Sequence, residues 1–392
     1  MLISIAIMLM TGMAAGWVCK KLRLPALLGM LLTGIMLGPY ALNLIDTSIL
    51  NISAELRRIA LIIILARAGL SLDMADLKRV GRPAVLMCFV PACFELLGMM
   101  LLAPRLLGIS VLDAAIMGAV VGAVSPAVIV PKMLKLMEEG CGTAKSIPQM
   151  ILAGASVDDV FVIVLFSAVT GLATGESISP VHFITIPVSI ILGIGLGLLA
   201  GWLLAGYFKR IHIRDTVKVL IILCLSFVLV SLEDLYSHLI PFSALIAIMA
   251  LGIALQKISQ NTARRLADKC NKLWIPAELL LFILVGASFD IRYALGAGKE
   301  AVLLILAVLL FRMAGVFCCL VKTNLTVSER LFCMLAYMPK ATVQAAIGGI
   351  PLAMGLPCGT IVLTVAVLSI IITAPLGAFL IDCTYKKLLK PG

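Results

Sequence analysis

Charged residues are scarce in this chain of 392 residues. They make up 13% of it, against about 25% in a soluble globular domain, while hydrophobic residues make up 62% and the mean hydropathy is +1.18. A water-soluble fold is therefore excluded, and we expect an all-α membrane protein. The net charge of +11 comes from basic residues scattered over short loops, which is typical of cytoplasmic loops and predicts no nucleic-acid partner.

Catalytic and metal-binding sequence patterns are missing as well. There is no H-E-x-x-H, G-x-S-x-G or nucleotide-binding motif, so we expect neither an enzyme nor a bound cofactor. None of the eleven cysteines forms a C-x-x-C pair, and most lie inside apolar runs. We interpret them as small buried hydrophobic residues, because a disulfide or zinc framework needs paired spacings.

Long apolar runs are abundant. Charged residues, prolines and glycines separate them into thirteen predicted transmembrane segments. The segments are 1–18, 25–42, 55–71, 83–107, 111–135, 147–172, 181–208, 215–232, 239–256, 272–289, 299–321, 327–350 and 358–381. Alternate loops, beginning with the one after the first segment, hold 23 Lys and Arg residues against 5 on the other side. The positive-inside rule then predicts a multi-pass protein of the cell (inner) membrane, with its N-terminus outside and its C-terminus in the cytoplasm.

Three sequence features recur later in the chain, each displaced by nearly the same number of residues. "GLSLD" (69–73) returns as "GASFD" (286–290), Pro25 returns as Pro241, and the mid-segment Pro126 returns as Pro339. These matches predict two five-helix repeats, about 25–172 and 241–381. Partner segments are seven apart, an odd number, so the repeats cross the membrane in opposite senses, as in secondary transporters.

Two of the predicted segments contain a proline near mid-membrane, Pro126 in the fifth and Pro339 in the twelfth. Proline removes a backbone donor and clashes with the preceding turn, so these two helices are predicted to be discontinuous. Broken helices are tolerated at membrane depth where they line a cavity or are buried in protein, and their free ends can bind an ion.

Asp158 and Asp159 lie side by side at the centre of the sixth segment. Each carboxylate costs roughly 2.5–3.5 kcal/mol at that depth on insertion scales, which points to a function. Carboxylates suit hard cations and also bind protons, so we predict a Na⁺ and proton site formed by this pair. Ser125 and Ser156 are candidate neutral oxygen ligands.

Three further charges are embedded in apolar segments. Glu95 lies at the centre of the fourth segment. The two repeats are displaced by 217 residues, so the position equivalent to Glu95 is Arg312 in the eleventh segment. We predict that the two pair near the repeat axis as an architectural lock, because Arg does not deprotonate. Lys340 follows Pro339 and is predicted to neutralise carbonyl ends or to pair with an aspartate.

Four stretches together resemble the monovalent cation:proton antiporter superfamily, in particular its sodium/proton exchangers with two adjacent aspartates. They are "ARAGLSLD" (66–73), "GAVVGAVSPAVIVPK" (118–132), "GASVDDVFVIVLFS" (154–167) and "YMPKATVQAAIGG" (337–349). The resemblance implies an NhaA-like fold, in which two discontinuous helices cross beside the aspartate helix, and a homodimer that works by alternating access. It also implies that Asp159 is the main ion carrier and Asp158 its neighbour.

The same resemblance suggests how the chain is divided. Residues 1–82 and 209–298 are expected to form panel and dimerisation helices, 83–172 and 299–392 the ion-transport core, and 173–208 a linker helix. The stoichiometry stays open, because Glu95 with Arg312 is similar to the buried pair of electroneutral members, whereas two aspartates accompany electrogenic ones.

These observations predict a secondary active antiporter that exchanges Na⁺ or Li⁺ for H⁺, with cation and proton competing for the buried aspartates. K⁺/H⁺ exchange by the same mechanism is one alternative. A second is a sodium-coupled symporter of an organic anion, in which Lys340 and the helix N-termini would hold the substrate carboxylate. A cation channel or a structural membrane protein would belong to a third class.

Overall fold

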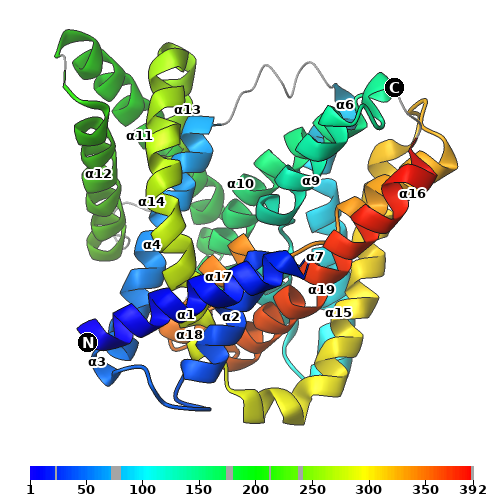
Figure 1. The fold of residues 1–392 in the computed structure, drawn as a ribbon. Helices are drawn as coiled ribbons and strands as arrows, with labels where there is room; N and C mark the ends of the chain where they lie inside the picture. The colour runs from blue at the N-terminus through cyan, green and yellow to red at the C-terminus, as the bar shows by residue number, and fades with distance from the viewer. Residues whose placement is uncertain (23, 72–80, 174–179, 212, 237–241, 390–392) are drawn as a thin grey trace. The chain divides into compact units, whose positions relative to one another are not determined.

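The computed structural model describes residues 1–22, 24–71, 81–173, 180–211, 213–236 and 242–389, and within these the side chains of 156, 180–187 and 294–297 are left aside. Every regular element formed by the described residues is a helix. The helices are α1 (Leu2–Lys21), α2 (Ala26–Leu37), α3 (Thr47–Asn51), α4 (Ser53–Ser71), α6 (Arg82–Met87), α7 (Val90–Leu107), α8 (Val111–Val121), α9 (Pro126–Glu138), η1 (Thr143–Lys145, a 3-10 helix), α10 (Ile147–Ala173), α11 (Pro180–Arg210), α12 (Asp215–Tyr236), α13 (Ala244–Ile258), α14 (Gln260–Ala287), α15 (Ile291–Leu320), α16 (Val327–Ala336), α17 (Thr342–Ile347), α18 (Ile350–Ala353) and α19 (Gly359–Leu388) (Figure 1).

Within the described residues, each of the thirteen predicted segments falls on one helix or on consecutive helices. Within the described part of the chain, nine stretches are long and apolar enough to cross a membrane. Three shorter apolar stretches, Ala26–Leu37, Ala244–Ile258 and Thr342–Ala353, and the helix α4 account for the other four segments. The segmentation by hydropathy therefore found the helices.

Two helices begin well before their predicted apolar segments. The segment predicted to begin at 272 is α14, which begins at Gln260, and the segment predicted to begin at 299 is α15, which begins at Ile291. In α15 the side chain of Asp290 accepts hydrogen bonds from the backbone N–H groups of Arg292 and Tyr293. Such polar first turns are helical but not apolar, so a hydropathy criterion leaves them out.

The chain divides into two compact units. The first contains the described residues of 1–57, 74–162 and 279–392, and the second contains those of 58–73 and 163–278. The predicted assignment of segments to panel, linker and core stays a prediction. The two predicted broken helices and the aspartates of α10 belong to the first unit.

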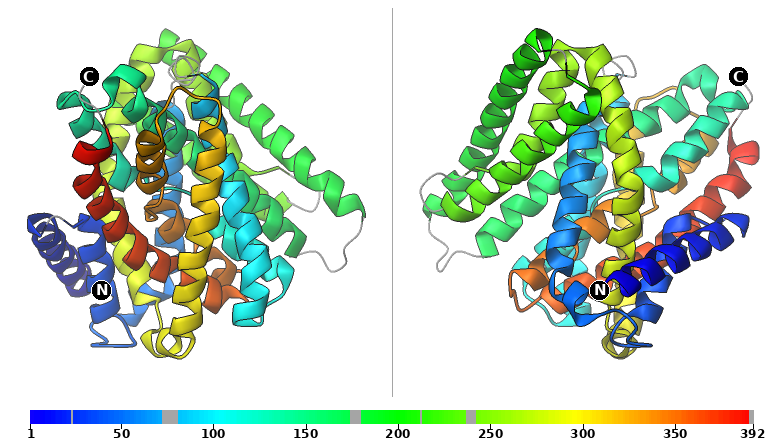
Figure 2. Two further views of the ribbon diagram at one scale, coloured as in Figure 1. Left: turned by 90° about the vertical axis from the view of Figure 1, so that its right-hand side faces the viewer. Right: turned by 60° about the vertical axis from the view of Figure 1, so that its left-hand side comes forward.

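Helix pairs build the first unit. α7 packs along α15, α8 packs on α7, and α16 packs on α19; Figure 2 shows α7 in cyan beside α15 in yellow. A cluster of buried side chains, which includes Met87, Ile151, Phe332 and Tyr337, ties α6, α10 and α16 together. The ends of these helices are fixed locally, for example by the capping box of Thr326 and Glu329 at the start of α16.

The second unit contains a very close helix pair, α11 with α13. Gly193, Gly197 and Gly201 recur every fourth residue on α11, and a Cβ atom added at any of them would overlap α13, at the carbonyls of Ser243, Ala247 or Leu251. Small residues at this spacing let two helix backbones approach, which compensates for the weak drive toward helix association in lipid.

Candidate functional site

Two helices of the first unit are interrupted where their prolines predicted a break. α8 ends at Val121 and α9 begins at Pro126, which occupies the first helical position. α16 ends at Ala336 and α17 begins at Thr342, so Pro339 lies in the gap. The interruptions, residues 122–125 and 337–341, leave backbone N–H and C=O groups without intrahelical partners. Both predicted discontinuities are confirmed.

The two interruptions touch each other. The backbone N–H of Ser125 donates to the carbonyl of Pro339 at 2.8 Å, so the two broken helices meet at these residues. Each interruption thus satisfies part of the other's backbone, which explains how irregular backbone is tolerated inside an apolar core.

Side chains near the second interruption cap the carbonyl end of α8. Lys340 Nζ donates to the carbonyl of Val121 at 2.8 Å. Gln344 Nε2 donates to the same carbonyl at 3.1 Å and to that of Ala123 at 2.7 Å. The carbonyl end of a helix carries partial negative charge, so a cation and an amide donor stabilise it there.

Arg312 of α15 joins both interruptions and two acids. Its Nη1 donates to the carbonyl of Gly122 and, at 2.6 Å, to Glu95 Oε2. Its Nε donates to the carbonyl of Tyr337 at 2.7 Å, and its Nη2 lies 3.1 Å from Asp158 Oδ2. A guanidinium has five N–H donors in one plane, which lets a single buried side chain serve four acceptors.

Glu95 of α7 is shared by two cations. Besides Arg312, it accepts from Lys340 Nζ at 2.5 Å, and all three side chains are at most 1% exposed. The Glu95–Arg312 contact predicted from the repeat offset is present. Lys340 neutralises a carbonyl end as predicted, but its acidic partner in this network is the glutamate rather than an aspartate, because its ammonium lies next to Glu95 on α7.

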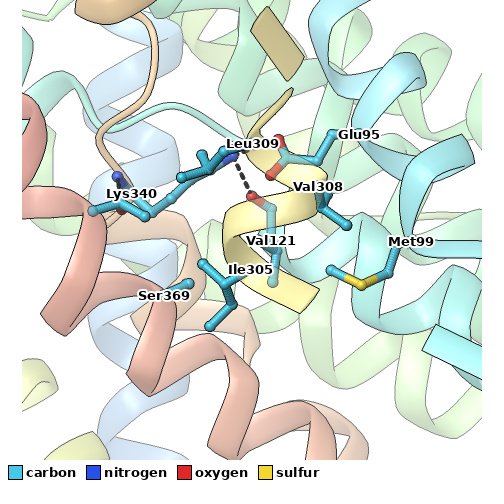
Figure 3. Close-up of a pocket in the computed structure, with 9 residues that line it drawn as sticks. Glu95, Met99, Val121, Ile305, Val308, Leu309, Lys340 and Ser369 are labelled. Carbon is cyan, nitrogen blue, oxygen red and sulfur yellow. Dashed lines mark hydrogen bonds and ion pairs between the residues drawn. The ribbon is translucent and has the colours of Figure 1, made fainter. Parts of the chain in front are cut away.

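A small pocket borders the Glu95–Lys340 pair. It is lined by these two side chains, by Ser369 and Thr373 of α19, and by apolar side chains of α7, α8 and α15 (Figure 3). Figure 3 shows the Lys340 side chain reaching across this pocket to Glu95 and to the carbonyl of Val121. The hydroxyl of Thr373 accepts from the backbone N–H of Lys340 at 2.9 Å, which orients the lysine within the interruption.

Asp158 of α10 faces the first interruption. Its Oδ2 accepts from the backbone N–H of Val124 at 2.7 Å as well as from Arg312, and the side chain is fully buried. The carboxylate is therefore held on one side by a guanidinium and on the other by an amide of the broken helix. This is the juxtaposition of an aspartate and a helix break that the sequence predicted.

The other predicted ligands lie in the same region of the chain. Asp159 is the next residue of α10 and is 9% exposed, against 0% for Asp158. Successive helical residues point about 100° apart, so the two carboxylates present different faces. Ser125 is the fully buried N-cap residue of α9, whereas the side chain of Ser156 lies outside the described part of the structure. The roles of these four residues in ion binding stay predictions.

Oxygen atoms dominate what the site offers to a cation. Among the described residues no three His, Cys, Asp or Glu side chains form a cluster that would hold a transition metal. A hard monovalent cation at this place would be held by carboxylate, hydroxyl and carbonyl oxygens instead.

Three residues of the site were missed by the sequence analysis: Gln344, Thr373 and Tyr337. Gln344 carried a usable signal, because an uncharged amide in an apolar segment, one turn after a break, needs a buried partner. Thr373 and Tyr337 carried none, since a single threonine or tyrosine is ordinary in an apolar helix.

Comparisons with known proteins show the family of this chain. A family described as "Sodium/hydrogen exchanger, transmembrane" matches residues 5–386. The chain is 34% identical over 409 residues to sodium/hydrogen exchanger 9B2 of Xenopus tropicalis, a match that covers 99% of this chain and 75% of that protein. It is 32% identical over 382 residues to sodium/hydrogen exchanger 9B2 of Homo sapiens, a match that covers 94% of this chain and 70% of that protein.

The fold is similar to that of a solved antiporter. The structure of the sodium proton antiporter MjNhaP1 from Methanocaldococcus jannaschii superposes with a TM-score of 0.85 at 21% identity, covering 98% of this chain and 97% of that one. The predicted fold class, an all-helical membrane protein with the antiporter architecture, is confirmed. Together with the family match over nearly the whole sequence, these likenesses show that the chain belongs to the sodium/hydrogen exchanger family.

Proposed function

We propose that this protein exchanges Na⁺ or Li⁺ for H⁺ across a membrane, with Asp158 and Asp159 as the exchange site. The observation that carries the proposal is the buried carboxylate of Asp158, bound to an amide of one broken helix where it meets a second one. Family membership and the shared antiporter fold support it.

The mechanism follows from competition for one carboxylate site. Asp159 is the more exposed of the two aspartates, at 9% against 0%, so we assign the exchanged ion to it. Asp158, which is held by Arg312 and by the N–H of Val124, acts as its neighbouring ligand. A carboxylate that has bound a proton no longer holds a metal ion, so a single site carries either ion and never both. Alternating access then moves the cation one way and the proton the other.

Competition for one carboxylate predicts an exchange of one cation for one proton. Among the described contacts, Glu95 and Asp158 are paired with the two buried cations Arg312 and Lys340. Either a monovalent cation or a proton would neutralise the carboxylate of Asp159 when it binds there. An uncompensated charge is costly at membrane depth, so the loaded forms change access and the empty form does not.

The contacts of the two cations argue against the organic-anion symporter. That alternative assigns Lys340 to the substrate carboxylate. Arg312 and Lys340 are already engaged by Glu95, by Asp158 and by the carbonyls at the end of α8. An incoming carboxylate would have to displace buried ion pairs, which is strongly unfavourable.

The proposal is tested in proteoliposomes by cation-dependent dissipation of a pH gradient, measured with Na⁺, Li⁺ and K⁺. We expect Na⁺ and Li⁺ to dissipate the gradient, and Asp159→Asn to reduce the rate to the protein-free background. Asp268→Asn, the same change at an exposed aspartate of α14, should leave the rate unchanged. Exchange by Asp159→Asn at the normal rate would refute the assignment, and dissipation by K⁺ alone would identify a K⁺/H⁺ exchanger instead.

We further propose a cell (inner) membrane location, an external N-terminus, a cytoplasmic C-terminus and a homodimer formed through residues 1–82 and 209–298. The loop charges support the orientation, because Lys and Arg are concentrated on one side. An epitope tag after Gly392 should be digested by protease in inside-out vesicles and protected in intact cells.

Light scattering tests the proposed homodimer. The mass of the protein in detergent should be about twice the 41.6 kDa of one chain.

A further inference from the structure

Four buried oxygen atoms beside the two interruptions have no hydrogen-bond partner in the described structure. They are Ser125 Oγ, Asp158 Oδ1, Thr342 Oγ1 and Gln344 Oε1. Their side chains are at most 2% exposed. A buried polar atom without a partner is rare in folded proteins, because its desolvation is not compensated. These four oxygens are therefore candidate ligands for a bound ion.

The first two of these oxygens lie beside the interruption between α8 and α9. Asp158 is fixed there because its other oxygen accepts from the N–H of Val124. Ser125 is the next residue along, and its N–H donates to the carbonyl of Pro339. The unpartnered oxygens of Asp158 and Ser125 therefore come from neighbouring points of the crossing.

The other two oxygens come from the first turn of α17, on the second broken helix. Gln344 Nε2 donates to the carbonyls of Val121 and Ala123, so its amide orientation is defined and Oε1 is the atom left for another partner. Thr342, two residues earlier, opens α17 directly after the interruption that contains Pro339. Both broken helices and the aspartate helix thus bring an unsatisfied oxygen to the same crossing.

The chemistry of the set selects the kind of ligand. The carboxylate and amide oxygens are acceptors only, and the two hydroxyls donate to no described atom, so all four atoms can accept from a donor or bind a positive ion. Oxygen atoms of mixed charge and type are what a hard cation binds. We propose that Thr342 and Gln344 of the second broken helix are ligands of the transported cation, together with Ser125 and Asp158; this inference rests on the proposed function.

In this arrangement the neutral ligands and the aspartates have different roles. A proton needs one carboxylate oxygen, whereas a metal ion needs several oxygens around it. Removing a neutral oxygen therefore weakens Na⁺ binding and leaves proton binding in place. Thr342 and Gln344 set the affinity and selectivity for the cation, and the aspartates set the competition with protons.

The test compares Thr342→Val, which keeps the side-chain volume and removes the hydroxyl, with Thr364→Val. Thr364 is equally buried at 2% exposure, and its hydroxyl is satisfied by the carbonyl of Thr360 in its own helix. Thr342→Ser retains the oxygen and serves as the rescue variant, and Ser125→Ala removes a second proposed ligand. Each purified protein is assayed for exchange in proteoliposomes and for Na⁺-dependent thermal stabilisation in detergent, which reports binding without transport.

We expect Thr342→Val and Ser125→Ala to raise the KM for Na⁺ about tenfold, equivalent to ~1.4 kcal/mol, with the maximal rate within about twofold. The ratio of Na⁺ to Li⁺ affinity should change, the proton inhibition constant should not, and Thr342→Ser should resemble the wild type. Equal KM values for Na⁺ in Thr342→Val and Thr364→Val would overturn the inference. Equal losses of cation affinity and proton affinity in Thr342→Val would also overturn it, because they indicate that the hydroxyl has a structural role or binds an ordered water. If wild-type protein shows neither exchange nor stabilisation by Na⁺, the proposed function itself fails.

Discussion

The two broken helices occupy equivalent places in the predicted repeats, yet they are stabilised differently. In the interruption between α8 and α9, carbonyl groups accept from Lys340 and Arg312, and the N–H of Val124 donates to the carboxylate of Asp158. Charged side chains of the opposite sign therefore lie at both polar ends of the first interruption, in addition to its neutral contacts with Gln344 and Pro339.

Mostly neutral groups satisfy the second interruption. The carbonyl of Pro339 accepts from a backbone N–H, and the N–H of Lys340 donates to the hydroxyl of Thr373. Only the carbonyl of Tyr337 meets a charge among the described contacts, that of Arg312. The repeat geometry thus provides two similar breaks, and the distribution of charged side chains favours an ion site at the first of them.

Removal of Arg312 should have the largest effect on this arrangement. Arg312→Met leaves Asp158 without its guanidinium partner and Glu95 with one cation instead of two, and breaking a buried ion pair by removing one member costs about 3–5 kcal/mol. We expect a strongly lowered melting temperature in detergent. Arg265→Met, which breaks an exposed ion pair with Asp215 in the second unit, should cost at most about 1 kcal/mol. Equal losses in the two variants would show that the buried network does not hold the breaks.

Glycine substitutions should distinguish the two interruptions by packing. A Cβ added at Gly377 of α19 would overlap the ring of Pro339, whereas one added at Gly122 lies 3.5 Å from the nearest Val162 atom and 3.0 Å from the carbonyl of Gly118. We expect Gly377→Ala to destabilise the protein by about 1–3 kcal/mol and Gly122→Ala by less than about 1 kcal/mol. Thermal unfolding of both variants measures the difference, and the reverse order would contradict the described packing.

The smallest predicted effect concerns the neutral partner of the second interruption. Thr373→Val deprives the backbone N–H of Lys340 of its acceptor, and a buried unsatisfied donor costs about 1–2 kcal/mol. Thr364→Val is the matched control on the same helix. A melting temperature equal to that of the control would show that the hydroxyl of Thr373 contributes nothing to the break.

Part of the site followed from the sequence because each signal was local or periodic. Proline chemistry located both interruptions, and a single repeat offset placed Glu95 opposite Arg312. Hydropathy located the helices but missed the polar first turns of α14 and α15, since a helical turn can be stabilised by caps rather than by apolar burial.

The remainder of the site depends on contacts across the fold that no local pattern encodes. Lys340 pairs with Glu95, 245 residues away, because α7 and α15 pack closely beside the second interruption. Gln344 reaches the carbonyls at the end of α8 only because the two broken helices cross. Side-chain partners of this kind are decided by three-dimensional packing, so the charges could be found from the sequence but their full pairing could not.

The central claim is that a cation and a proton compete for one buried carboxylate site, and the pH dependence of Na⁺ transport tests it most directly. Exchange in proteoliposomes should be measured over a range of Na⁺ concentrations at several pH values, with the pH equal on both sides. Competition predicts that the KM for Na⁺ rises, approaching about tenfold per pH unit on the acid side, while the maximal rate stays constant. A KM that does not depend on pH, with a maximal rate that falls as protons are added, would contradict the account.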